Sequence, residues 1–312
     1  MMTIKAITFR KDGFYGQPFA FGGEDGPEKF DPNVRYRGAL TNYLIDTGDE
    51  VILVDTGLPA GTPEEAPDEK SPAFTGRDVG TYMSQFAALG YKPEQVTKIL
   101  LTHKHADHSG ELKSFPNAKI YVNADEVSAD ELKGLGNLVP VTFTDGPYYN
   151  FPASQKIRDG IYYIKAKGHT NGNSIVIVEL DGLFYMIHGD ITYVDEALYA
   201  NKLSVVYDDK AAARETLDRV REFIRNHPTV YVSTHTPPPG LREPGGEAGD
   251  GPGPSRGDHL RGIRLWRHDG LRQVRLFRLR LRVRPRRARR RGIRRPARGL
   301  EVSPLQAAEG EV

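Results

Sequence analysis

Residues 100–110 read LLTHKHADHSG, which places three histidines and an aspartate within six positions at the end of an apolar run. Two histidines two residues apart on extended backbone point the same way, so they can bind one metal ion together. The aspartate and the third histidine then fall on the following turn, where they could reach a second ion. These four candidate ligands are His103, His105, Asp107 and His108.

Four side chains from one loop cannot complete two coordination shells, so further ligands must come from elsewhere in the chain. Three candidates follow apolar runs: IYYIKAKGHT presents His169, LFYMIHGD presents Asp190, and TVYVSTHT presents His235. The sequence contains no cysteine. Any metal site must therefore use imidazole and carboxylate ligands.

The pattern of short apolar strands and amphipathic helices predicts an α/β fold in which helices cover the sheet faces. Predicted strands include residues 43–45, 51–54, 119–122, 161–164, 174–179, 183–187 and 230–233, together with the run that delivers His103. Apolar spacing predicts a helix capped by Asp78 and ending at Gly90, and a second helix over residues 209–226. Residues 58–77 are rich in Pro, Glu, Gly and Ala and are predicted to form an exposed loop.

The motif order H-x-H-x-D-H, G-H-T, G-D and a late strand-end histidine resembles the metallo-β-lactamase superfamily of hydrolases. The resemblance implies an αββα four-layer sandwich with its site at one edge of two facing sheets. It implies two metal ions with this division of ligands: the first ion is held by His103, His105 and His169, the second by Asp107, His108 and His235, and Asp190 bridges both. Asp55, in ILVDTG, matches the family's aspartate that orients the ligand loop.

The resemblance also implies the chemistry, in which a metal-bridging hydroxide attacks an electrophilic carbonyl or phosphorus centre. Asp107 and Tyr193 are the expected catalytic residues. Two zinc ions are the expected cofactors, although this ligand set also suits iron or another divalent metal.

The segment GDITY places Tyr193 three residues after Asp190, which resembles the D-x-x-Y of the N-acyl-homoserine lactonases, where the tyrosine hydroxyl contacts the lactone carbonyl. The predicted reaction is therefore opening of a lactone ring, with an N-acyl-homoserine lactone as the substrate and quorum quenching as the role. A packed aromatic is the alternative interpretation of Tyr193. Lys167 and Asn171 stand where the family often has prolines, a departure that leaves the ligand His169 in place.

Another ester or thioester, of the acylglutathione type, is the competing substrate class in the same fold. The two classes would differ in the pocket walls, for which residues 58–77 and 132–152 are the candidates. The second segment carries Phe143, Tyr148, Tyr149 and Phe151, which could either grip an acyl chain or pack locally.

Charge divides the chain near residue 240. Residues 1–240, the expected hydrolase domain, carry 24 Lys+Arg and 33 Asp+Glu, whereas residues 241–312 carry 19 arginines, 8 acidic residues and no lysine. This Gly/Pro/Arg-rich tail could be a basic arm of a nuclease or nucleic-acid-binding protein. The total lack of lysine favours translation in a shifted reading frame, with a disordered or poorly packed product. The N-terminus fits neither a signal peptide nor a membrane span, so a cytoplasmic enzyme is expected.

Overall fold

A computed structural model describes residues 2–66, 68 and 70–238. The Arg-rich tail predicted from residue 241 onward lies outside the described residues. The predictions that this tail is disordered, or that it is a basic arm, concern those same residues and stay predictions.

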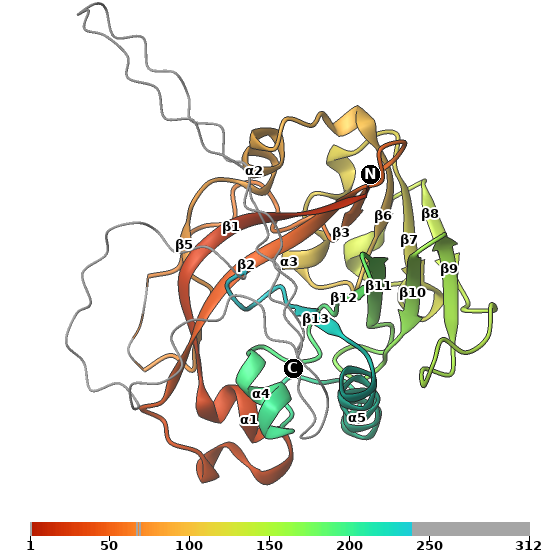
Figure 1. Ribbon diagram of the computed structural model, residues 1–312. Coiled ribbons are helices and arrows are strands. Elements are labelled where there is room, and N and C mark those ends of the chain that lie inside the picture. Colours follow the sequence, from red (N-terminus) through yellow and green to blue (C-terminus); the bar gives the residue numbers. More distant parts are fainter. Residues whose placement is uncertain (1, 67, 69, 239–312) are drawn as a thin grey trace, which may run out of the picture. The chain divides into compact units, whose positions relative to one another are not determined.

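Two mixed β-sheets form the centre of the described part (Figure 1). The first sheet contains β1 (Thr3–Gly16), β2 (Arg35–Asp46), β3 (Val51–Val54), β4 (Ala73–Phe74), β5 (Arg77–Asp78), β6 (Val96–Leu100), β7 (Lys119–Asn123) and β8 (Leu138–Val141). Its order is β4-β1-β2-β3-β6-β7-β8, and β5 also pairs with β1. The second sheet contains β9 (Ser154–Arg158), β10 (Ile161–Lys165), β11 (Ser174–Leu180), β12 (Leu183–Ile187) and β13 (Thr229–Val232), in the order β13-β12-β11-β10-β9.

The sheets face each other across an apolar core. Ile45, Ile52 and Val54 from the first sheet share this core with Tyr163 and Val176 from the second. All four residues of β3 are buried, as expected for a strand whose two faces are both covered. The two sheets therefore form the inner layers of a sandwich.

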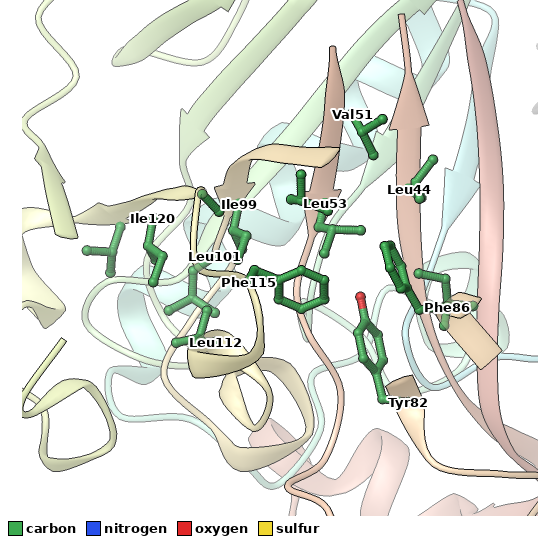
Figure 2. Close-up of a cluster of buried hydrophobic side chains, with 14 of the residues drawn as sticks. Leu44, Val51, Leu53, Tyr82, Phe86, Ile99, Leu101, Leu112, Phe115 and Ile120 are labelled. Atoms are coloured by element: carbon green, nitrogen blue, oxygen red, sulfur yellow. The ribbon is translucent and has the colours of Figure 1, made fainter. Parts of the chain in front are cut away.

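Helices cover the outer faces. The helix α2 (Tyr82–Ala88) packs on the first sheet, where Tyr82 and Phe86 meet Phe115 in the cluster shown in Figure 2. The helix α5 (Lys210–Asn226) packs on the second sheet through Leu217 and Phe223. The predicted αββα sandwich is confirmed. The other α-helices among the described residues are α1 (Gln17–Asp25), α3 (Ala106–Ser109) and α4 (Asp195–Ala200).

The predicted start of α2 was wrong. Asp78 lies in β5, where its carboxylate accepts a hydrogen bond of 2.8 Å from Nε of the buried Arg10. Thr81 is the N-cap, and its hydroxyl accepts from the backbone N–H of Ser84. A long-range ion pair thus decides the role of Asp78, which a local capping pattern could not reveal.

The predicted loop over residues 58–77 also contains structure, because β4 and the start of β5 pair with β1. The strand β1 and the helix α1 have no counterpart among the sequence-based predictions. The N-terminal residues therefore contribute more to the fold than their sequence indicated.

Strand direction brings the candidate ligands to one rim of the sandwich. In the first sheet β3 and β6 are parallel. In the second sheet β10 and β12 are both antiparallel to β11, and β13 is parallel to β12. The carboxyl ends of β10, β12 and β13 therefore share one edge, and the loops after them carry His169, Asp190 and His235.

Candidate metal centre

One group of candidate ligands contains three imidazoles whose nitrogens nearly touch. His103 Nε2 lies 3.1 Å from His105 Nδ1 and 3.2 Å from His169 Nε2. The distance from His105 Nδ1 to His169 Nε2 is 3.0 Å. Two nitrogens bound tetrahedrally to one Zn²⁺ would lie roughly 3.3 Å apart. The triad therefore fits a single metal ion, with Asp190 as the fourth member of the group.

A second group combines Asp107, His108 and His235. The Nε2 atoms of His108 and His235 each lie 3.6 Å from Asp107 Oδ2. Asp190 stands between the groups, because its Oδ1 is 3.2 Å from His108 Nε2 and its Oδ2 is 3.4 Å from His169 Nε2. The structure thus brings all seven predicted ligands together in the predicted division.

Two buried atoms in the centre lack hydrogen-bond geometry with any described residue. They are His108 Nε2 and Asp190 Oδ1, which face each other. Buried polar atoms normally have a partner, and a cation between these atoms would supply one. The donor set and these orphaned atoms both fit a pair of metal ions.

Asp55 supports this arrangement from beneath. It follows β3 with φ of 65°, and only 1% of its surface is exposed. Its Oδ1 accepts a hydrogen bond of 2.7 Å from the backbone N–H of Thr102. Its Oδ2 lies 2.8 Å from Thr102 Oγ1 and 2.7 Å from His108 Nδ1. These contacts hold His108 with Nε2 directed toward the centre, an arrangement compatible with the expected role of Asp55 in orienting the ligand loop.

Burial and charge shift the pKa values of the centre in opposite directions. Burial lowers the pKa of His103 well below its ordinary value, and it lowers the pKa of His169 to about 4. Burial opposes charge on His108 as well, but the neighbouring carboxylates, Asp107 first, outweigh it and raise the pKa of His108 well above the ordinary value. Neutral imidazoles are the form that binds metal, and the lowered pKa values keep His103 and His169 in that form near neutral pH.

Glycines allow two of the ligand loops to approach their neighbours closely. Gly168, with φ of 137°, would bring a Cβ within 2.2 Å of Ala213 Cα in α5. Gly189, with φ of 59°, would bring one within 2.8 Å of Thr102 Oγ1. Both positions thus require glycine for His169 and Asp190 to reach the centre. Lys167 and Asn171 do not displace His169 from its group.

His235 is held by strands from the start of the chain. Its carbonyl accepts a hydrogen bond of 3.0 Å from the N–H of Ala39, and its Nδ1 lies 2.7 Å from the hydroxyl of Tyr15. The hydroxyl of Tyr43 donates to the carbonyl of Ser233 at 2.9 Å. β1 and β2 therefore position this last candidate ligand.

Tyr193 lies against the second group. Its ring stacks on His235 with centroids 4.5 Å apart, and Phe19 meets its edge at 4.9 Å. Burial raises the pKa of Tyr193 well above its ordinary value, and the charges of Asp190 and Asp107 add to the shift. The hydroxyl therefore stays protonated near neutral pH. Tyr193 is both a packed aromatic and a neighbour of the centre.

Three of the four aromatics in residues 132–152 pack in the apolar cores. Phe143 lies in the core between the sheets, whereas Tyr148 and Phe151 pack near Phe223 of α5. Tyr149 is 55% exposed. Of the two interpretations of this segment, local packing describes Phe143, Tyr148 and Phe151, which are buried in the two cores.

The two predicted wall segments still meet at one hollow. It has a volume of about 220 Å³, and Pro59, Ala106, Ser109, Lys113 and Leu135 are among its lining residues. Ala106 lies between His105 and Asp107, the two candidate ligands that are not fully buried. The hollow therefore adjoins the solvent-facing side of the ligand loop.

A family model described as the metallo-beta-lactamase superfamily matches residues 36–235. The chain belongs to this superfamily. The predicted resemblance is confirmed, and the chain is a superfamily hydrolase with residue clusters that could bind metal ions.

Several relatives in the superfamily are lactonases. An N-acyl homoserine lactonase of Bacillus cereus is 24% identical over 203 residues, which cover 62% of this chain and 79% of the relative. A probable metallo-hydrolase of Mycobacterium tuberculosis is 29% identical over 174 residues, covering 48% of this chain and 56% of the relative. These relatives support the family and leave the substrate open.

Solved structures agree in fold. An N-acyl homoserine lactone hydrolase with the product N-hexanoyl-L-homoserine at its catalytic metal centre gives a TM-score of 0.59 at 16% identity, covering 75% of this chain and 92% of that one. A dizinc quorum-quenching lactonase gives a TM-score of 0.54 at 16% identity, covering 78% and 92%. Among residues 2–66, 68 and 70–238, none of the helices is both long and apolar enough to cross a membrane.

Two residues of the centre escaped the sequence-based prediction. Thr102 hydrogen-bonds Asp55 and also lies 3.1 Å from His103 Nδ1. Its position next to His103 at the end of an apolar run was a usable signal. Tyr15 is 220 residues from its partner His235. Nothing in the local sequence marks that contact.

Proposed function

We propose that the chain is a dinuclear zinc hydrolase that opens a lactone ring, with an N-acyl-homoserine lactone as substrate. The position of Tyr193 carries the proposal. Its ring stacks on His235, and the negative charge of Asp190 is close enough to raise the pKa of its hydroxyl. The lactonase named among the relatives supports it. Hydrolysis of such a lactone would give the enzyme a role in quorum quenching.

The proposed ligands divide as the geometry groups them. His103, His105 and His169 would hold the first ion, and Asp107, His108 and His235 the second. Asp190, which lies near both groups, would be shared between them. Two bound zinc ions would supply an acidified water as nucleophile and polarise the substrate carbonyl. Other divalent metals suit the same ligands.

The protein's own residues orient the substrate and handle protons. Tyr193, kept neutral by its raised pKa, donates a hydrogen bond to the carbonyl oxygen as negative charge develops there. The side chain of Asp107 is 20% exposed and lies at the less buried side of the centre. Its carboxylate can accept the proton released by the attacking water and pass it to the ring oxygen when the carbonyl carbon–oxygen bond breaks.

Turnover of a substrate panel by the zinc-loaded protein tests the proposal. The panel contains acyl-homoserine lactones, simple esters, acylglutathione thioesters and phosphodiesters. We expect kcat/KM to be highest for the lactones, with homoserine products confirmed by mass spectrometry. Preferred hydrolysis of a thioester or phosphodiester would refute the proposed substrate.

Variants test the residue roles separately. Asp107→Ala and His169→Ala should abolish turnover. Tyr193→Phe should lower kcat by roughly 10²-fold with zinc content unchanged, because it removes one donor to the developing oxyanion. Tyr148→Phe is the matched control, since it removes another buried tyrosine hydroxyl, bonded to Glu179. Equal rates for Tyr193→Phe and Tyr148→Phe would remove the proposed role of Tyr193.

A further inference from the structure

Tyr15 occupies the end of β1 and contacts the centre from outside the segment that matches the family. The family match begins at residue 36, so it does not include Tyr15. Only 2% of the Tyr15 surface is exposed, and its hydroxyl lies 2.7 Å from His235 Nδ1. The backbone of Tyr15 pairs with Tyr36 in β2 and with Ala73 in β4. The hydroxyl is therefore held by two neighbouring strands.

The contact determines which nitrogen of His235 can bind a metal ion. A neutral imidazole carries one proton, and the nitrogen without it offers the lone pair. His235 Nε2 faces the centre, 2.8 Å from Asp190 Oδ2. When Nε2 binds a metal ion, the single proton of the neutral ring is on Nδ1, which can donate it to the hydroxyl oxygen of Tyr15.

Three other histidines of the centre also have a polar partner at Nδ1, the nitrogen on the side away from the other group members. His108 Nδ1 contacts the Asp55 carboxylate, His103 Nδ1 lies 3.1 Å from Thr102 Oγ1, and His169 Nδ1 lies 3.3 Å from a backbone carbonyl. Such partners fix the tautomer and the ring orientation of a ligand. Tyr15 has the equivalent position for His235.

We propose that Tyr15 is a positioning residue that selects the Nδ1–H tautomer of His235 and thereby sets the affinity of the second metal position. The inference rests on the metal ligation proposed above and does not depend on the substrate. The rings of Phe19 and Tyr193 pack on Tyr15 with centroids 5.8 and 5.3 Å away. A Tyr15→Phe variant keeps these contacts and removes the hydroxyl.

Metal titration of the full-length protein tests the inference. Metal-free protein is titrated with Co²⁺ while the visible spectrum and the bound metal content are recorded. We expect Tyr15→Phe to raise the Kd of the second ion about 10- to 100-fold. The Kd of the first ion should stay the same, because the hydroxyl contact of Tyr15 is to His235 of the second group.

Tyr43→Phe is the matched control. It removes a buried tyrosine hydroxyl bonded to Ser233, two residues before His235, without touching an imidazole. Because Tyr43 supports only the backbone of the His235 loop, we expect Tyr43→Phe to raise the Kd of the second ion less than Tyr15→Phe does. An unchanged second Kd in Tyr15→Phe would overturn the proposal, and so would an equal increase in both variants, which would indicate loop stabilisation alone.

The wild-type protein supplies a measurement that does not depend on how the variant folds. Long-range ¹H–¹⁵N NMR of the zinc-loaded protein should show His235 protonated at Nδ1. A proton on Nε2 would overturn the proposal. Wild-type protein that binds only one ion would refute the dinuclear ligation itself, which distinguishes that failure from a failure of Tyr15.

Discussion

Replacing Asp55 by asparagine tests how the ligand loop is supported. The carboxylate accepts from the N–H of Thr102, the hydroxyl of Thr102 and Nδ1 of His108. Asparagine has nearly the same shape and tolerates the positive φ at this position. Asparagine has one oxygen and one NH₂ group in place of the two carboxylate oxygens. The NH₂ group must therefore face a hydrogen-bond donor, either the N–H of Thr102 or the N–H of His108.

The magnitude follows from the two possible amide orientations. If the NH₂ group faces Thr102 N–H, a buried donor loses its partner, which costs about 1–3 kcal/mol. If it faces His108, Nδ1 must become the acceptor, and the proton moves to Nε2, the nitrogen that faces the centre. Burial raises the pKa of Asp55, so removal of its charge offsets part of the cost. We therefore expect a loss of about 1 kcal/mol in the metal-free protein and a 10- to 100-fold weaker second metal ion.

Urea unfolding and metal analysis after equilibrium dialysis measure the two effects. Asp46→Asn is the control, because Asp46 is a partly exposed carboxylate bonded to Tyr91. It should change metal content little. Asp55→Asn protein that retains both ions with wild-type affinity would refute the view that Asp55 directs His108.

Three further outcomes follow from the structure. Burial raises the pKa of Glu126, so wild-type protein loses stability as pH rises through the folded-state pKa and the buried carboxyl ionises. The stability of Glu126→Gln relative to wild type should therefore increase between pH 4.5 and 7.5. Urea-unfolding free energies of the two proteins that change in parallel with pH would contradict this. Phe86→Ala should lower the free energy of unfolding by about 3–5 kcal/mol, because Phe86 is fully buried (Figure 2), whereas Val205→Ala at a 38% exposed position should change it by less than about 0.5 kcal/mol. Chelation should lower the melting temperature, and zinc at 100 times its Kd should restore about 2.7 kcal/mol; no response to zinc would indicate that the folded protein does not bind it.

The candidate ligands could be predicted from sequence because each lies at or just after the end of an apolar run. His103, His169, Asp190 and His235 all stand just after a strand, and parallel strand ends gather at one edge of a sheet. The spacing of the histidines then indicated a metal site. This part of the prediction needed only local patterns and one topological rule.

Other features depend on contacts that local sequence does not encode. Asp78 had the composition of a helix cap but pairs with the buried Arg10. Tyr148 and Phe151 had the composition of a binding loop but pack near Phe223 of α5. In each case a partner more than 60 residues away determines the role of the side chain.

His235 depends on both a local pattern and long-range contacts. It stands five residues before residue 240, near which the composition changes, so the sequence made its loop the least certain part of the centre. The structure ties that loop backward, through Ala39 and Tyr43 of β2 and through Tyr15 of β1. Residues 36–235 contain all seven candidate ligands but omit Tyr15. The ligand set can therefore be recognised within the family segment, whereas the support for its last member comes from strand β1, ahead of that segment.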